Sequence, residues 1–591
     1  MTSAILAGLL LLAGLATPSG RAVTGWALRA TSTVRVLVIA TVLTAGLAVL
    51  ARQYVEVRLY GMTMAVSTVA FCGLFLLARQ ASSLSSSFSD WLLGRSVLVL
   101  ASGSVVLSVL ACWLVLDAVP HISDEVAYLF QAGALAAGRL TQPIGPDPEA
   151  FTTTHTLIWH GKWFGIMNPG WPLLLAAGVR VGVPWLVNPL LGGGAVAAFW
   201  WYCREAGLPE RVAKVAALLL VVSPFAVFQN ASVMSHTAHL ALFLVFGAGW
   251  TRFLKNGSLR DALIAGAALI LGVLVRPVDM VVALIPFAVL FLATLRVRRG
   301  RLAGGSVVVV AAVIALGLTL AYNYVLTGDA LTMPTSLYFN LRNPAERFGL
   351  GFGADMGTTM HGDEWSGFFL ADAVRVSAYR LSELLLNVAG APVLIMAALL
   401  GSAWWRGSGV TPLAWSAFTM VALYFFHFYH GIAYGARHLY IALPVAALAI
   451  ALPVGAALDS ASAEARLRAK AVITATIAFL VMFAFPPLVR EYGSRYRGVD
   501  GAVRDAVTRS GLSNAVVFVD SLNWAWKAAF PLNAYPLEEN RVLMARDRGA
   551  GNARVMTAFP GRRFYRLSVA NDGRVALAPL SAVDSIRTSR P

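Results

Sequence analysis

The chain has 591 residues, of which 58% are hydrophobic and 13% are charged, and its mean hydropathy is +0.71. A soluble globular protein carries about a quarter charged residues, and this little polar surface could not cover so many apolar side chains. The composition excludes a cytoplasmic enzyme, a disordered chain and a nucleic-acid-binding domain, and indicates a polytopic membrane protein. The net charge of +17 then fits cytoplasmic loops and anionic lipid headgroups.

Apolar runs recur along the chain, and a spanning helix needs roughly 20 such residues. An apolar segment at 4–16 has no basic residues before it, so it is read either as a membrane helix or as a signal-like segment. With it, we expect about 13 or 14 spanning helices. The other spans are expected near 34–50, 61–78, 96–116, 184–202, 212–229, 236–253, 260–275, 278–295, 305–323, 387–403, 411–428, 438–456 and 469–486.

Basic residues in alternate short loops predict the orientation, because such loops stay in the cytoplasm. The opposite, external face then holds the two long loops 117–183 and 324–386 and the tail from about 488. The cytoplasmic set comprises Arg204, Arg211, Lys214, Arg252, Lys255, Arg260, Arg296, Arg298, Arg299, Arg301, Arg466, Arg468 and Lys470.

Three parts follow from this pattern: additional N-terminal membrane helices over 1–95, a membrane core over 96–487, and a small external, periplasmic domain over 488–591. In the tail, 501–510 has helical spacing, and 515–520, 542–545 and 564–569 are strand candidates. The serine-rich run 82–89 is expected to be a cytoplasmic linker. The expected fold class is an all-α polytopic membrane protein with a small C-terminal α/β domain.

Two adjacent carboxylates, Asp124 and Glu125, open the first external loop just after a membrane span. They precede an apolar stretch, up to residue 140, that is expected to lie on the membrane surface as an amphipathic helix. Because neighbouring residues on a helix point in different directions, we expect one carboxylate to work in a cleft and the other to hold a loop or an ion. The alternative is a solvated acid pair with Asp124 as an N-cap.

Ionisable groups also gather at the external ends of other predicted spans. A charge at the rim of a bilayer is costly, which makes it a functional candidate. Snorkelling of a rim arginine and simple interfacial anchoring are the alternatives. His239, His427 and His430 are expected to be packing residues, and no HExxH, P-loop, GxSxG or CxxC motif is present. The candidates are Lys162, His236, Arg276, Arg437 and His438.

Together these residues predict an external cleft with one acidic pair, several cations and apolar walls. Such a cleft suits a substrate with a lipid tail, a phosphate and a polar headgroup, for example a polyprenyl-phosphate sugar. The phosphate is already a good leaving group, so the protein needs only a base for the acceptor hydroxyl and cations for the departing phosphate.

The sequence resembles the GT-C superfamily of integral-membrane glycosyltransferases, and within it the family 39-like group of protein O-mannosyltransferases and aminoarabinose transferases. The resemblance covers roughly 96–456. It is carried by the Asp124-Glu125 pair, by the surface-helix pattern after it and by the run 168–172 (NPGWP). Asn323-Tyr324, Thr327-Gly328-Asp329 and Pro334 are similar to the family's late external loop. Where many members have Lys-Pro-Pro, this chain has Asn168-Pro169-Gly170.

The resemblance implies a polyprenyl-phosphate sugar donor, a lipid, glycan or protein acceptor of the cell envelope, and inversion at the anomeric carbon. It makes Asp124 the catalytic base and Glu125 its partner, positioning the base or a divalent cation. It also implies residence in the bacterial inner membrane. A membrane transporter or lipid flippase, and a non-catalytic subunit of an envelope-assembly complex, stay open as alternatives.

Overall fold

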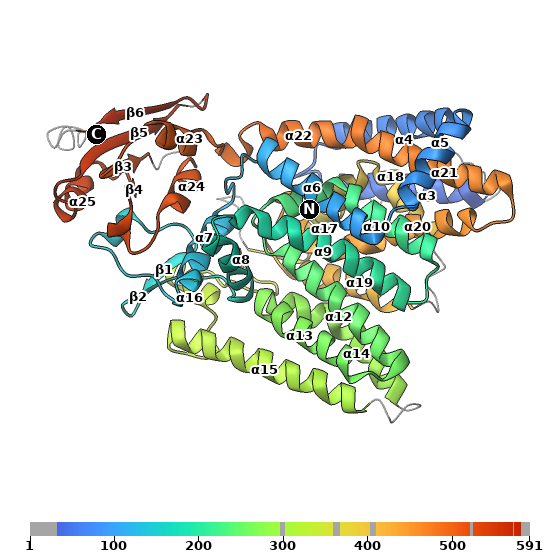
Figure 1. The fold of residues 1–591 in the computed structure, drawn as a ribbon, viewed down its shortest axis with the longest axis horizontal. Coiled ribbons are helices and arrows are strands. Elements are labelled where there is room, and N and C mark those ends of the chain that lie inside the picture. Colours follow the sequence, from blue (N-terminus) through green and yellow to red (C-terminus); the bar gives the residue numbers. More distant parts are fainter. Residues whose placement is uncertain are drawn as a thin grey trace.

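The computed structural model describes residues 32–295, 302–357, 367–401, 409–520, 524–570 and 572–580. The segment 4–16 and four of the basic residues, Arg296, Arg298, Arg299 and Arg301, lie outside these ranges. A long bundle of helices makes up most of the molecule, and a smaller part that contains a β-sheet lies at one end of it (Figure 1).

Every one of the 13 spans expected between 34 and 486 overlaps a helix. The helices up to residue 295 are α3 (Ser32–Leu50), α4 (Val57–Gln80), α5 (Ser82–Leu93), α6 (Val97–Leu114), α7 (Ser123–Ala136), α8 (Gly170–Arg180), α9 (Pro184–Glu205), α10 (Glu210–Val222), α11 (Pro224–Ala231), α12 (His236–Asn256), α13 (Leu259–Val275) and α14 (Pro277–Leu295). The later helices of the bundle are α15 (Leu302–Thr327), α16 (Pro334–Arg342), α17 (Leu370–Ala389), α18 (Pro392–Gly401), α19 (Thr411–Phe425), α20 (Leu443–Leu458), α21 (Ala463–Phe479) and α22 (Phe485–Gly493).

Seven helices of the described chain are long and apolar enough to cross a membrane, and the number is nine if each of two bent pairs is one span. One pair, α10 and α11, bends by 56° at Ser223, where Pro224 supplies no amide hydrogen to continue the helix. The other, α17 and α18, bends by 100° after Gly390, which has a left-handed φ of 67°. The chain is therefore an integral membrane protein.

Burial divides the spans into inner and outer helices. Within their spanning windows, α12 and the span that contains α20 are 72% buried, whereas the span made by α15 is 22% buried. Exposed aliphatic residues such as Val309, Val313 and Leu316 line α15. In a membrane this apolar surface contacts lipid tails, so it needs no protein cover.

The described loops of the expected cytoplasmic set lie at the end of the bundle far from the sheet (Figure 1), and some of them contact one another. Arg211 donates to the carbonyl of Leu458 and to Asp459, and Lys214 donates to the carbonyl of Leu93. The run 82–89 lies in this region, but it is part of helix α5, so the expected linker is wrong. Ser85 and Ser89 are buried, and their hydroxyls are satisfied by hydrogen bonds to carbonyls of α4 and α21.

The tail holds a four-stranded sheet in the order β4-β3-β5-β6, in which β3 runs parallel to β4 and β5 and β6 is antiparallel to β5. The three expected strands and the expected helix are confirmed, and β6 was not foreseen. All five residues of the central strand β3 are buried, as an unbroken apolar run predicts. The elements are α23 (Ala502–Arg509), β3 (Ala515–Val519), α24 (Trp526–Ala529), β4 (Val542–Arg546), α25 (Asn552–Ala558), β5 (Arg563–Val569) and β6 (Val575–Pro579).

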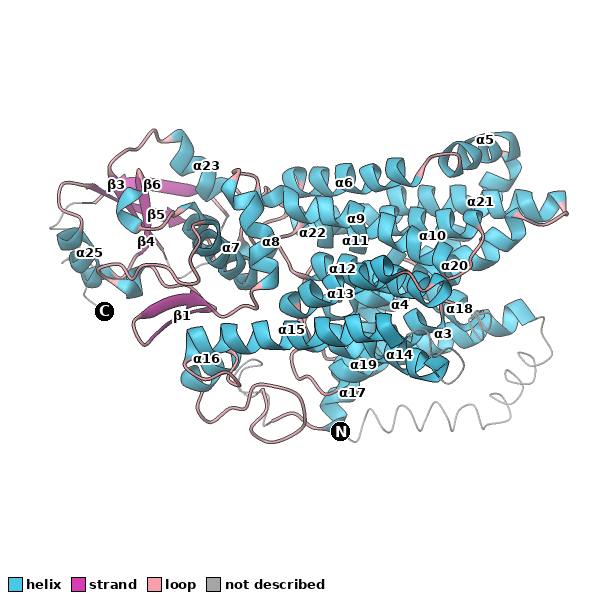
Figure 2. Ribbon diagram, turned by 60° about the horizontal axis from the view of Figure 1, so that its bottom comes forward, coloured by secondary structure: helices cyan, strands magenta, loops and turns pink. Residues whose placement is uncertain are grey.

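The first long loop is folded and packs against the tail. It contains α7, the antiparallel hairpin of β1 (Thr156–Trp159) and β2 (Lys162–Gly165), and α8. Figure 2 shows all strands gathered at this end. Val126 and Phe130 of α7 belong to hydrophobic clusters built mainly from tail residues. The expectation of a surface helix is therefore half right: α7 is a helix, but α8 and the tail bury most of it.

Candidate functional site

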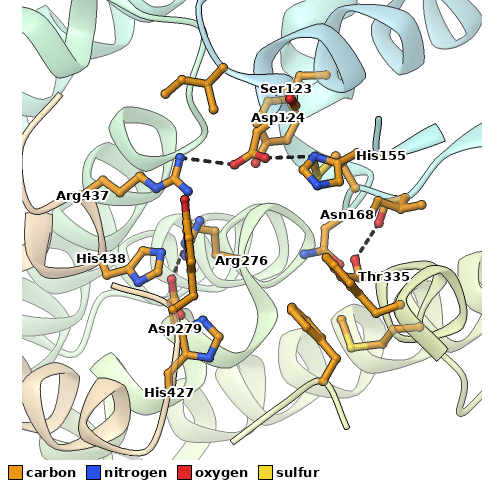
Figure 3. Close-up of a pocket in the computed structure, with 18 of the residues that line it drawn as sticks. Ser123, Asp124, His155, Asn168, Arg276, Asp279, Thr335, His427, Arg437 and His438 are labelled. Carbon is orange, nitrogen blue, oxygen red and sulfur yellow. Dashed lines mark hydrogen bonds and ion pairs between the residues drawn. The ribbon is translucent and has the colours of Figure 1, made fainter. Parts of the chain in front are cut away.

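A cavity of about 780 Å³ lies where the helix bundle, the first long loop and the tail meet (Figure 3). Its walls come from the N-terminus of α7, the segment before α8, the junction of α13 and α14, α16, and the segments around residues 427–438, 497 and 524–527. The polar and charged lining residues on which the argument rests are Asp124, His155, Arg276, Asp279, Arg437, Arg497 and Lys527.

Asp124 is the second residue of α7 and points into the cavity between two basic side chains (Figure 3). Its Oδ1 lies 3.0 Å from Nδ1 of His155, and its Oδ2 lies 3.2 Å from Nη1 of Arg437. Burial alone would raise the pKa of Asp124, but Arg437, His155 and Arg276 hold it well below its usual range. The site therefore presents an ionised carboxylate to the cavity.

Glu125 points away from Asp124 and is 1% exposed. Its Oε2 accepts hydrogen bonds from the amides of His121 and Ile122, at 2.9 and 3.1 Å, and from the hydroxyl of Tyr434 at 3.1 Å. Its Oε1 accepts from the amide of Val233 at 2.8 Å. Glu125 thus ties the start of α7 to the α11–α12 loop and to the segment that carries Arg437.

Arg276 lies between α13 and α14 and is fixed by three partners. Its Nε donates to Asp279, its Nη2 donates to the Tyr424 hydroxyl at 2.9 Å, and its Nη1 lies 3.3 Å from Ser235 Oγ. The Tyr424 hydroxyl in turn donates to Asp279 at 2.8 Å. The guanidinium is therefore rigidly placed before any ligand arrives.

The predicted site residues fall into two groups. Asp124, Arg276, Arg437 and His438 line the cavity together, as Figure 3 shows. Glu125, Lys162 and His236 do not line it. Lys162 donates to the carbonyl of Val325, and His236 is buried with its ring 6.2 Å from that of His438.

Several cavity residues were not singled out from the sequence. His427, expected to be a packing residue, lines the cavity, and so do His155, Asp279 and Lys527. Only Asp279 left a local signal, since its three-residue spacing from Arg276 suits an ion pair at a helix start. His155 sits in a turn with a left-handed φ of 68°, where sequence periodicity carries no information.

A metal ion shared by Asp124 and Glu125 does not fit this arrangement. Both oxygens of Glu125 are taken by backbone amides and a tyrosine, and Asp124 faces two basic groups. Within the described ranges, no three or more His, Cys, Asp or Glu residues are grouped so as to hold a metal ion.

No family model and no curated protein matches the chain. Among solved structures it is similar to the apo oligosaccharyltransferase of Archaeoglobus fulgidus, with 16% identity and a TM-score of 0.44 over 76% of this chain and 61% of the other. It is also similar to ArnT from Cupriavidus metallidurans bound to undecaprenyl phosphate, with 12% identity and a TM-score of 0.47, over 81% and 97% of the two chains. A third is the A. fulgidus oligosaccharyltransferase AglB with an inhibitory peptide and a dolichol-phosphate, at 15% identity, a TM-score of 0.42, and 66% and 56% coverage. The chain thus spans 61% of the length of the first of these proteins.

Proposed function

We propose that the protein is a GT-C-type glycosyltransferase that moves a sugar from a polyprenyl-phosphate donor to an acceptor hydroxyl of the cell envelope. The observation that carries the proposal is the placement of Asp124, whose carboxylate oxygens contact His155 and Arg437 in a cavity between membrane helices and the tail. A carboxylate beside fixed cations suits a reaction in which a hydroxyl loses a proton while a phosphate gains charge.

Arg276 and Arg437 are proposed to bind the donor phosphate. Arg276 lies between α13 and α14, and Arg437 is the first residue of the span Arg437–Leu458, so both lie at ends of membrane helices. A donor whose lipid tail stays in the bilayer places its phosphate at this level. Arginine binds phosphate through two parallel hydrogen bonds, which suits Arg276 because its position is already fixed.

Arg437 links donor binding to the strength of the base. In the free protein Arg437 pairs with Asp124 and lowers its pKa. A bound phosphate would compete for the same guanidinium and bring negative charge close to Asp124. Both changes raise the pKa of Asp124 and make it a stronger base when donor is present.

The reaction then needs one displacement. The acceptor oxygen forms a bond to the anomeric carbon, the bond from that carbon to the phosphate oxygen breaks, and the electron pair leaves with the phosphate. The acceptor proton passes to Asp124, and a single displacement inverts the anomeric centre. Glu125 takes no part in the bond changes and positions Asp124 through the start of α7.

We also propose that the cavity and the tail lie on the external, periplasmic face of the bacterial inner membrane. The basic loops at the opposite end of the bundle support this orientation. A reporter enzyme fused after the tail should be active only outside the cytoplasm, and activity confined to the cytoplasm would contradict the orientation.

The test of function uses purified protein, a panel of radiolabelled polyprenyl-phosphate sugars and membrane lipid or glycan extracts as acceptors. Label should pass from at least one donor to an acceptor in the wild type, and this transfer should be lost in Asp124→Asn. Movement of an intact lipid across vesicles without any label transfer would support the flippase alternative instead.

A further inference from the structure

The basic residues on the two walls of the cavity differ in whether they form an ion pair with a carboxylate. On the bundle side, Arg276 pairs with Asp279 and Arg437 pairs with Asp124. On the tail side stand two more cations, Arg497 and Lys527. Among the residues that the structure describes, neither of them forms an ion pair, and both donate to backbone carbonyls. The carboxylates that attract the two tail cations, Asp124 and Glu125 for Lys527 and Glu491 for Arg497, therefore act from farther away.

Lys527 is buried, with 5% of its surface exposed, and its ammonium group makes one hydrogen bond within the described chain. Its Nζ donates to the carbonyl of His121 at 3.0 Å, three residues before Asp124. An ammonium group has three donors, so this contact fixes the amine at the cavity wall and leaves capacity for a ligand. Burial lowers the pKa of Lys527 to about 8, so the amine is mostly protonated at neutral pH.

Arg497 is exposed and stands at the same wall. Its Nη2 donates to the carbonyl of Ile432 at 2.7 Å, and its guanidinium lies 5.6 Å from the ring centre of Tyr496. Its backbone has a left-handed φ of 55°, a conformation that is uncommon for an arginine. The guanidinium is thus held at the cavity wall by a carbonyl and an aromatic ring, without an ion pair to any described residue.

Trp524 completes this wall with an apolar face. It lines the cavity and is 56% exposed, and the amine of Lys527 lies over one face of its ring, 4.5 Å from the ring centre. A large aromatic side chain that stays exposed beside two cations offers a flat surface for the apolar face of a sugar ring, with cations next to it for a charged substituent.

We propose that Trp524, Arg497 and Lys527 form an acceptor subsite for a sugar that carries an anionic group, a phosphate or a carboxylate. The inference rests on the proposed function. The donor must keep its lipid in the bilayer, which assigns its phosphate to Arg276 and Arg437, whereas the tail wall faces the cavity from the other side. The acceptor hydroxyl would then lie between this wall and Asp124.

The test separates the two anion sites by titration of the full-length protein in neutral detergent. The probes are glucose 6-phosphate and glucose, each titrated with the donor site saturated by undecaprenyl phosphate. Wild-type protein should bind glucose 6-phosphate at least tenfold more tightly than glucose. Arg497→Gln and Lys527→Met should each weaken glucose 6-phosphate binding by about tenfold. Neither should change binding of undecaprenyl phosphate.

Matched controls lie outside the cavity. Lys162 also donates to a backbone carbonyl, and Arg562 also combines backbone acceptors with an aromatic ring, that of Phe559. Lys162→Met and Arg562→Gln should leave both titrations unchanged. Because Arg497 is exposed, its variant gives a result even if Lys527→Met unfolds.

Two results would overturn the subsite: equal binding of glucose and glucose 6-phosphate by the wild type, or loss of undecaprenyl phosphate binding in Arg497→Gln. The second would make the tail cations part of the donor site. If the wild type does not bind undecaprenyl phosphate, the proposed function is contradicted but the subsite is not. The glucose 6-phosphate titration can then be run without undecaprenyl phosphate and still tests the subsite.

Discussion

Replacing Glu125 by glutamine tests whether this residue holds the site together or takes part in chemistry. Its two oxygens accept four hydrogen bonds, three from backbone amides and one from Tyr434. Glutamine keeps one acceptor oxygen. If that oxygen faces the three donors grouped at Oε2, its NH₂ group faces the amide of Val233.

The cost follows from these contacts. One buried amide without an acceptor costs about 1–3 kcal/mol, and this is the expected loss of stability. Glu125→Ala removes every acceptor and should cost more. The purified variant should unfold at a clearly lower temperature, and the amide of Val233 should exchange with deuterium faster.

Glu205→Gln is the matched control, because Glu205 accepts a hydrogen bond from Trp201 at the opposite end of the bundle and is only partly buried. It should change the unfolding temperature little. If Glu125→Gln unfolds like Glu205→Gln, with unchanged exchange at Val233, the positioning role is wrong.

Three further outcomes are expected. His155→Gln should reduce sugar transfer less than loss of Asp124 does, because His155 only orients the carboxylate; equal loss would make His155 a candidate base. Arg276→Gln should weaken undecaprenyl phosphate binding about tenfold, while Arg211→Gln, at the far end of the bundle, should not; equal effects would count against the donor site. Burial lowers the pKa of His121 from 6.5 to about 4, so the unfolded chain binds more protons between these values and stability falls as pH falls through that window. From pH 7 to 5 this loss is about 2 kcal/mol, and His121→Asn should reduce the corresponding drop in unfolding temperature; an unchanged drop would refute the assignment.

The membrane helices and tail strands could be predicted because their signals are local. A run of apolar residues must be buried in lipid or protein whatever lies elsewhere in the chain. The same holds for the central strand β3, whose five consecutive apolar residues leave no solvent face. The bends at Ser223 and Gly390 were harder to foresee, since proline and glycine also occur within unbroken membrane helices.

The site could be predicted only in part. The Asp124-Glu125 pair was visible as two charges after a span, and the split of their roles follows from helix geometry. The partners of these residues were not visible, because Glu125 meets Tyr434 across 309 positions and Lys527 meets His121 across 406. No periodicity links such distant segments, so the tail's place in the cavity had to come from the structure.

The central claim is that the cavity transfers a sugar with Asp124 as the base. The most direct measurement is single-turnover transfer from a radiolabelled polyprenyl-phosphate sugar, with wild type and Asp124→Asn compared at equal amounts of folded protein. A general base contributes about 10²–10⁴-fold, so the variant should lose at least 100-fold in rate while it still binds undecaprenyl phosphate. Transfer at the wild-type rate by Asp124→Asn would contradict the account.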